Sequence, residues 1–86
     1  MNDTRLKNQY DVCIVGTGRV GLPLGLSLIE AGVSVLGLDI DARLRQEVNG
    51  GRMPFAEPGY EELVAQRELW VTDDTSFIAR CDAIVV

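Results

Sequence analysis

The sequence predicts an α/β fold in which helices cover both faces of a parallel sheet, and two features support this prediction. Four short apolar segments alternate with segments that predict helices, and in the first of these, residues 19–31, the apolar residues recur at spacings of three and four. Glycine, proline or acidic residues separate these segments. Strands that alternate with helices pair in parallel through right-handed crossovers, which favours the strand order 3-2-1-4. We therefore expect the first half of a doubly wound domain.

The first strand and the first helix lie in the apolar first third of the chain. Residues 11–15 are a short apolar run, typical of a strand buried on both faces. The apolar residues of 19–31 have helical spacing, and Gly32 stands where a left-handed C-cap belongs. The apolar run 20–38 has the length of a membrane span, but a proline and several glycines divide it into a helix and a strand.

The second strand and the second helix follow directly. Residues 34–38 are again apolar and predict a buried strand. Asp41 can then cap a helix over 42–48, because its side-chain oxygen can accept from the free N–H groups of the first turn. The Asn-Gly-Gly sequence at 49–51 ends this helix.

A loop rich in breakers, residues 51–58, opens the second half of the chain. Pro58 can start a helix there, with Glu61 and Glu62 in the first turn, where acidic side chains stabilise the helix dipole. Residues 69–72 predict the third strand.

The end of the chain predicts a short helix over 73–80 and a fourth strand over 82–86. A fold does not normally stop on an uncapped apolar strand, so we expect a fragment of a longer protein whose open edge makes it prone to associate. Residues 1–10 are polar and mixed in charge, and we expect a flexible tail there. The folded domain would then occupy residues 11–86.

The composition limits the classes of partner. The 86 residues include 13 acidic and 8 basic ones, and a net charge of −5 argues against nucleic acid or an anionic membrane as a partner. With no histidine and only Cys13 and Cys81, the sequence predicts neither a metal site nor a disulfide framework. We expect a cytoplasmic protein, since this cysteine usage fits a reducing compartment.

Gly16, Gly18 and Gly21 form a G-x-G-x-x-G pattern between the first strand and the first helix. The first glycine permits a tight turn, the second lets the backbone approach a pyrophosphate, and the third lets the helix pack closely on the strand. In this context the pattern predicts a Rossmann-like dinucleotide-binding fold; a turn whose glycines only relieve crowding is the alternative. The predicted binding residues of the turn are Gly16, Thr17, Gly18, Arg19, Val20 and Gly21.

Asp39 ends the second strand, 18 residues after Gly21, near the spacing of a ribose-binding acid. Its carboxylate can accept from both ribose hydroxyls and would repel the extra phosphate of NADP, so NAD is the predicted cofactor. The alternative is a helix-capping carboxylate, a role that Asp41 can fill instead. Ile40 and Arg43 complete the predicted cofactor-binding residues.

Three segments, residues 16–23, 37–41 and 49–63, resemble the UDP-glucose/GDP-mannose dehydrogenase family. The third is the specific one, because generic Rossmann domains lack its Asn-Gly helix end, following proline and Glu-Pro-Gly before a helix. The resemblance covers nearly all of residues 11–86. It covers only the N-terminal cofactor domain of that family.

This resemblance implies an NAD-dependent nucleotide-sugar 6-dehydrogenase of polysaccharide biosynthesis. Such enzymes oxidise the C6 alcohol of a UDP- or GDP-hexose to a carboxylate with two NAD, and here a UDP-hexose is implied, UDP-glucose or a UDP-N-acetylhexosamine. A homo-oligomer is also implied. The nucleophilic cysteine of the family and its partners lie downstream of this segment, so we expect no catalytic residue here and no activity of the 86 residues alone. Cys13 and Cys81 are then small core residues.

The chain departs from the family at two positions. Arg19 replaces the usual aromatic residue, and its side chain either faces the pyrophosphate or is solvated. Leu44 stands where many relatives carry a basic residue near the adenine ribose, and Arg43 or Arg45 either substitutes for it or lies on a solvated helix face. Glu57 either points toward the cofactor or caps a helix.

Two other classes share parts of the pattern. The Gly-Arg-Val-Gly string also resembles nucleotide-sensing domains that regulate potassium channels and transporters, but these have no counterpart of the loop within residues 51–63. The N-terminal domain of β-hydroxyacid dehydrogenases is built similarly, but those that use NADP end the second strand on a basic or neutral residue. Asp39 and the Glu-Pro-Gly loop therefore favour the sugar dehydrogenase.

Overall fold

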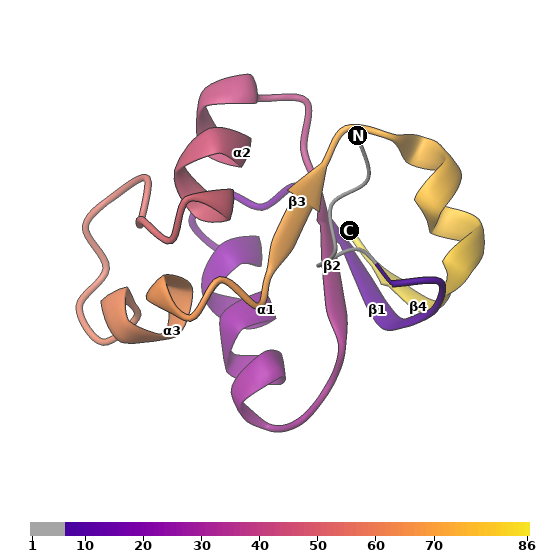
Figure 1. Cartoon of the computed structure of the whole chain (residues 1–86), viewed down its shortest axis with the longest axis horizontal. Helices are drawn as coiled ribbons and strands as arrows, with labels where there is room; N and C mark the ends of the chain where they lie inside the picture. Colours follow the sequence, from indigo (N-terminus) through magenta and orange to yellow (C-terminus); the bar gives the residue numbers. More distant parts are fainter. Residues whose placement is uncertain (1–6) are drawn as a thin grey trace.

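A four-stranded parallel sheet of order β3-β2-β1-β4 forms the centre of the protein (Figure 1), in a computed structural model that describes residues 7–86. This confirms the predicted fold class and strand order. The predicted tail falls largely on residues 1–6, which lie outside the described residues. In chain order the elements are β1 (Tyr10–Val15), α1 (Gly21–Glu30), β2 (Val35–Leu38), α2 (Ala42–Asn49), α3 (Glu61–Ala65), β3 (Trp70–Thr72), the 3₁₀ helix η1 (Thr75–Arg80) and β4 (Cys81–Val85).

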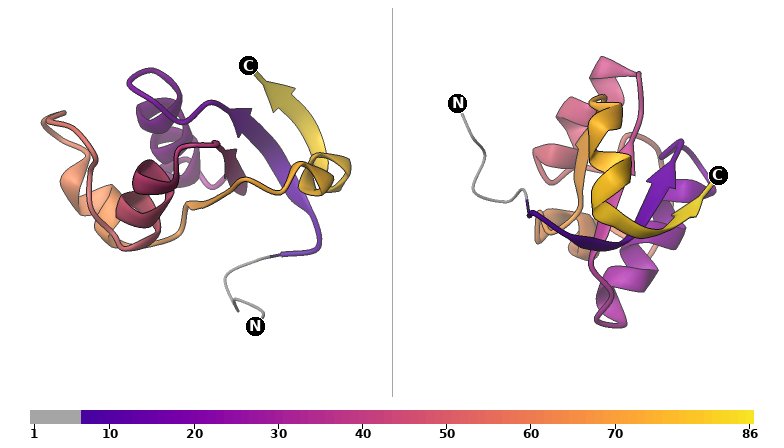
Figure 2. Two further views of the ribbon diagram at one scale, coloured as in Figure 1. Left: turned by 90° about the horizontal axis from the view of Figure 1, so that it is seen from above. Right: turned by 90° about the vertical axis from the view of Figure 1, so that its right-hand side faces the viewer.

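Helices lie on both sides of the sheet. The three α-helices cover one face and η1 covers the other (Figures 1 and 2). The larger core cluster joins the sheet to α1, α2 and α3; its buried members are Ile14, Leu22, Leu26, Val35, Val48, Val64, Leu69 and Val71. The smaller cluster joins the sheet to η1 through Tyr10, Leu36 and Phe77. Each strand of the sheet interior is therefore apolar on both faces, which is the cause of its near-continuous apolar sequence.

The outer edge of β3 is covered by one side chain. The Asn49 amide nitrogen donates to the carbonyl oxygen of Val71 over 2.9 Å, and the Val71 N–H donates to the Asn49 side-chain oxygen over 2.8 Å. This amide therefore bonds both backbone groups of Val71, as a neighbouring strand would. Satisfying the polar groups of an edge strand removes a template for pairing with another chain.

The first helix is shorter than predicted but ends as expected. It begins at Gly21, after the glycine turn, and Gly32 takes a left-handed φ of +94° beyond its end. The apolar run 20–38 is divided between α1 and β2. Within residues 7–86, no helix combines the length and the apolar character needed to cross a bilayer.

The prediction that Pro58 starts a helix is wrong. Gly59 has a φ of +96°, a left-handed conformation that cannot continue into a right-handed helix, so α3 begins only at Glu61. Glu61 then accepts the Gly59 N–H over 3.2 Å. Both acidic residues remain in the first turn of the helix, as predicted.

The remaining elements shift by one or two residues. Tyr10 is buried and opens β1, so the predicted tail ends before it. The predicted helix over 73–80 is a 3₁₀ helix that begins at Thr75, because Asp74 caps it and accepts the Ser76 N–H over 3.0 Å. β4 begins at Cys81.

Candidate functional site

The glycine turn lies at the carboxyl end of β1, where the chain passes into α1. Gly16 has a φ of +87°, a conformation that a side chain disfavours, and its N–H donates to the Leu38 carbonyl over 2.8 Å. This hydrogen bond ties the start of the turn to the end of the neighbouring strand. Ligands of open parallel sheets bind at this end of the strands.

The other two glycines of the turn have different surroundings. A Cβ on Gly21 would overlap the carbonyl oxygen of Gly16, so the helix can approach the turn this closely only with glycine there. A Cβ on Gly18 would meet no protein atom within 4 Å. Gly18 therefore faces open space beside the turn, as expected for a site where a ligand approaches the backbone.

Three backbone amides of the turn are available to a ligand. Within residues 7–86, the N–H groups of Gly18, Arg19 and Val20 donate no hydrogen bond. They stand at the positive end of α1, a ten-residue helix. Free amides at a helix start favour a phosphate or another anion.

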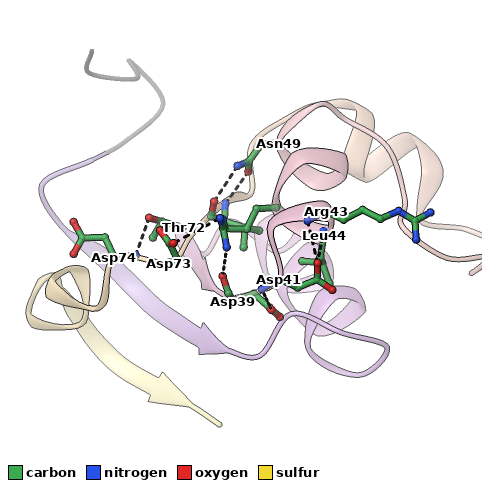
Figure 3. Close-up of polar contacts among 10 residues, drawn as sticks. Asp39, Asp41, Arg43, Leu44, Asn49, Thr72, Asp73 and Asp74 are labelled. Atoms are coloured by element: carbon green, nitrogen blue, oxygen red, sulfur yellow. Dashed lines mark hydrogen bonds and ion pairs between the residues drawn. The ribbon is translucent and has the colours of Figure 1, made fainter.

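Asp39 directly follows β2 and hydrogen-bonds both the glycine turn and Asp41, and Figure 3 shows its contact with Asp41. One carboxylate oxygen accepts the Thr17 N–H over 2.9 Å, and the other accepts the Asp41 N–H over 2.9 Å. A carboxylate oxygen has two lone pairs, so the oxygen that accepts the Asp41 N–H retains capacity for a further donor such as a ribose hydroxyl, whereas the other oxygen also faces the Thr17 hydroxyl. Asp41 is the helix cap, accepting the N–H groups of Arg43 and Leu44 over 3.0 and 3.2 Å, so Asp39 does not cap α2.

Thr17 supports Asp39 from inside the protein. Its side chain is fully buried, and its hydroxyl lies 3.4 Å from the Asp39 carboxylate. A Cβ on Gly37 would come within 2.8 Å of the Thr17 methyl group. The sequence predicted contact between Thr17 and a cofactor, whereas its structural surroundings are Asp39 and the sheet. Gly37, which makes room for it, was not singled out.

A cleft of about 250 Å³ lies beside Asp39, between the ends of β1 and β2 and the 3₁₀ helix. Its apolar walls include Val15, Leu38, Ile40 and Ile78. Ile40 is 93% exposed, so its side chain is free to pack on a ligand. An apolar cleft beside a carboxylate can hold a flat base and its ribose. Ile78 was missed because only the packing of η1 brings it to this end of the sheet.

Arg45 connects the ends of β2 and β3 at the same end of the sheet. Its guanidinium donates to the Asp39 carbonyl over 3.0 Å and forms an ion pair with Asp73 at 3.6 Å. Of the two arginines considered beside Leu44, this one is therefore engaged by the protein. The Arg43 side chain extends away from Asp39 and Asp73 (Figure 3) and lines a second hollow.

The second hollow has a volume of about 210 Å³ and lies between the turn, the start of α2 and the loop before α3. Its lining residues are Arg19, Asp41, Arg43, Leu44, Pro54 and Phe55. Glu57 lies in the same loop, but its predicted alternative role as a helix cap is wrong. The N-cap of α3 is Tyr60, and no side chain caps that helix.

The two cysteines do not form a nucleophilic site. Cys13 is completely buried, and this burial raises the pKa of its thiol to about 12. Burial also raises the pKa of Cys81, whose thiol donates to the Phe77 carbonyl at 3.4 Å. Both thiols are therefore protonated at neutral pH, and the thiolate is the nucleophilic form.

The family model of the UDP-glucose/GDP-mannose dehydrogenase family, NAD binding domain, matches residues 10–86. The chain belongs to this family. The match excludes the two other classes considered from the sequence. NAD is the cofactor of this domain, and the members of the family are NAD-dependent dehydrogenases.

Individual relatives agree with this assignment. UDP-glucose 6-dehydrogenase YwqF of Bacillus subtilis is 46% identical over 54 residues, which are 63% of this chain and 12% of the relative. UDP-N-acetyl-D-mannosamine dehydrogenase of Campylobacter jejuni is 34% identical over 58 residues, 66% of this chain and 14% of the relative.

A solved structure also matches. GDP-mannose dehydrogenase from Pseudomonas aeruginosa superposes with a TM-score of 0.79 at 30% identity, over 87% of this chain and 19% of that one. The chain thus spans less than a fifth of the length of these relatives.

Proposed function

We propose that this chain is the NAD-binding segment of a nucleotide-sugar 6-dehydrogenase that oxidises the C6 alcohol of a UDP-hexose to the uronic acid. The observation that carries the proposal is the set of free turn amides beside the Asp39 carboxylate, in a chain of this family. UDP-glucose and UDP-N-acetylhexosamines are the proposed substrates, in keeping with the names of YwqF and of the Campylobacter jejuni enzyme.

The residues of the site divide the work of holding the cofactor. The amides of Gly18, Arg19 and Val20 would hold the diphosphate, since they have no other acceptor among the described residues. Asp39 would accept the ribose hydroxyls. Ile40 and Ile78 would enclose the adenine in the apolar cleft. NAD, when bound, supplies the hydride acceptor of the reaction.

The proposed reaction removes four electrons from C6. The alcohol, two NAD⁺ and one water give the carboxylate, two NADH and three protons, so each cofactor molecule takes one hydride. The high pKa of Cys13 and the hydrogen-bonded thiol of Cys81 argue that neither attacks the sugar. We therefore propose that the nucleophile belongs to another part of the protein and that residues 11–86 form no NADH alone.

We also propose the setting of the enzyme. The free thiols of Cys13 and Cys81 fit a reducing cytoplasm. Uronic acids carry a carboxylate that suits acidic polysaccharides, which supports a place in polysaccharide biosynthesis. A homo-oligomer is proposed for the whole protein on the basis of the family resemblance.

Titration of the protein with NAD and with NADP tests the site. We expect the unaltered protein to prefer NAD, because the Asp39 carboxylate repels a 2′-phosphate at close range. Asp39→Asn keeps an acceptor for the Thr17 N–H but removes the charge, so the preference should fall about tenfold. Glu30→Gln, an exposed acid at the end of α1, is the matched control. Equal binding of both cofactors by the unaltered protein would refute the role of Asp39.

A further inference from the structure

Two arginines beside the glycine turn have no acidic partner. Among the described residues, Arg19 and Arg43 take part in no ion pair, whereas Arg45 and Arg52 each bind an acidic side chain. Both unpaired arginines line the hollow of about 210 Å³ next to the turn. A positive hollow at the start of two helices is suited to an anion.

Phe55 fixes the place of the Arg19 guanidinium. The guanidinium carbon lies 4.9 Å from the centroid of the Phe55 ring, within the range of a cation–π contact. An exposed arginine has many rotamers, and a partner that selects one lowers the entropy lost when a ligand binds. The contact therefore prepares Arg19 without using its hydrogen-bond donors.

Asp41 is the acid that faces this pair in the hollow. One of its oxygens already accepts two N–H groups at the start of α2, from Arg43 and Leu44. The hollow thus contains two positive groups and one negative group that is held by the backbone. Its charge remains positive on balance.

We propose that Arg19 and Arg43 clamp a phosphate of the bound dinucleotide, with Phe55 positioning Arg19. This inference rests on the proposed function. Arg19 belongs to the turn whose amides would hold the diphosphate, and the Arg43 backbone follows Asp39 by four residues, beside the proposed ribose site. Guanidinium groups bind phosphate oxygens through paired donors, so the clamp adds charge and direction to the amide site.

Binding of ligands with and without phosphate separates this clamp from a general effect on the site. We expect Arg19→Gln and Arg43→Gln each to weaken NAD and ADP about tenfold, since a charge-assisted hydrogen bond is lost. Adenosine has the base and the ribose but no phosphate, so its dissociation constant should not change. Raising the salt concentration should weaken ADP binding less in Arg19→Gln than in the unaltered protein.

Arg80 provides a matched control. Its guanidinium carbon lies 4.6 Å from the Phe77 ring centroid, so Arg80→Gln removes the same charge and a similar aromatic contact away from the turn. It should bind ADP as the unaltered protein does. Phe55→Leu should weaken ADP about threefold and should add nothing in the Arg19→Gln background, because the ring acts through the arginine.

The outcomes distinguish this inference from the proposed function. If the unaltered protein binds neither NAD nor ADP, the proposed function fails. If it binds both, and Arg19→Gln and Arg43→Gln bind ADP as tightly as Arg80→Gln, the clamp is wrong and the cofactor site stands. Equal weakening of ADP and adenosine would also overturn the clamp, because the arginines would then act on the shape of the site.

Discussion

Gly18 and Gly21 belong to one sequence pattern, but their surroundings give them opposite roles. A Cβ on Gly21 would overlap the Gly16 carbonyl oxygen, whereas a Cβ on Gly18 would meet only open space. The fold therefore requires a glycine at position 21, and we propose that the ligand requires one at position 18. The pattern in the sequence does not separate these two requirements, since both select the smallest residue.

Alanine substitutions should separate them experimentally. Gly21→Ala must displace backbone and should lower the free energy of unfolding by about 1–3 kcal/mol or more. Gly18→Ala should leave the melting temperature within about 2 °C but weaken NAD roughly tenfold, because its methyl group enters the space of the diphosphate. Chemical denaturation and calorimetric titration of both variants measure this. Intact NAD binding by Gly18→Ala would contradict the role assigned to that position.

Among single residues, those fixed by local chemistry were predictable and those fixed by distant packing were not. The sequence predicted that the glycine turn follows the first strand and that Asp39 follows the second, and the structure has both at these positions. Arg45 was one of two arginines left open, because its contact with Asp73 depends on how β3 lies beside β2. Gly37 was not singled out, since its need for a small residue comes from the methyl group of Thr17 in the glycine turn, a contact between distant parts of the sequence.

At the level of elements, the residues of the turns decided whether the start of a helix was predicted correctly. The strands and the first two helices were predicted to within a few residues because apolar periodicity marks them. The start of α3 was mispredicted because Pro58 is a good first residue of a helix, but the left-handed Gly59 after it delays the helix. Only the backbone conformation of Gly59 decides whether the helix begins at Pro58 or at Glu61.

The cap of η1 makes one element sensitive to pH. Asp74 accepts from the Ser76 hydroxyl and backbone N–H, and these hydrogen bonds lower the pKa of its carboxyl group. The carboxyl pKa is then lower in the folded protein than in the unfolded chain. The cap hydrogen bonds stabilise the fold fully at pH values above the unfolded-state pKa, and this stabilisation is lost as the pH falls through the folded-state pKa. NMR titration of the carboxyl groups should give Asp74 a lower pKa than an exposed aspartate without such hydrogen bonds.

Asp74→Asn is the control for this pH dependence, because asparagine is an equally good N-cap without a titrating group. Its melting temperature should lose the part of the acid dependence that Asp74 contributes, while the Asp74→Ala variant should be less stable at neutral pH as well. An ordinary pKa for Asp74 would show that the cap hydrogen bonds do not persist in solution.

At the level of the whole molecule, the two edge strands of the sheet, β3 and β4, differ. The outer edge of β3 is occupied by the Asn49 amide, whereas β4, among residues 7–86, pairs with β1 on one side and with no strand on the other. Ile84 is 48% exposed and Val85 is 37% exposed on this strand. We expect the 86-residue chain to associate through β4, as an exposed apolar edge strand favours pairing.

Asn49→Ala provides the test of this asymmetry. The unaltered chain should form dimers with a fixed upper mass in light scattering, and the variant, with both edges open, should form larger species that grow with concentration. Asn8→Ala, which removes an amide outside the sheet, is the control. A strictly monomeric unaltered chain would refute association through β4.

The Asn49 amide also determines the geometry of any such association. With one edge closed, two molecules that join through β4 turn their closed β3 edges outward, so the assembly is self-complementary and stops at two. A sheet with two open edges has no such limit, because each added molecule presents a new edge to the next. We therefore expect the asparagine at the end of α2 to limit association to a pair of molecules, where a second open edge would let a fibre grow.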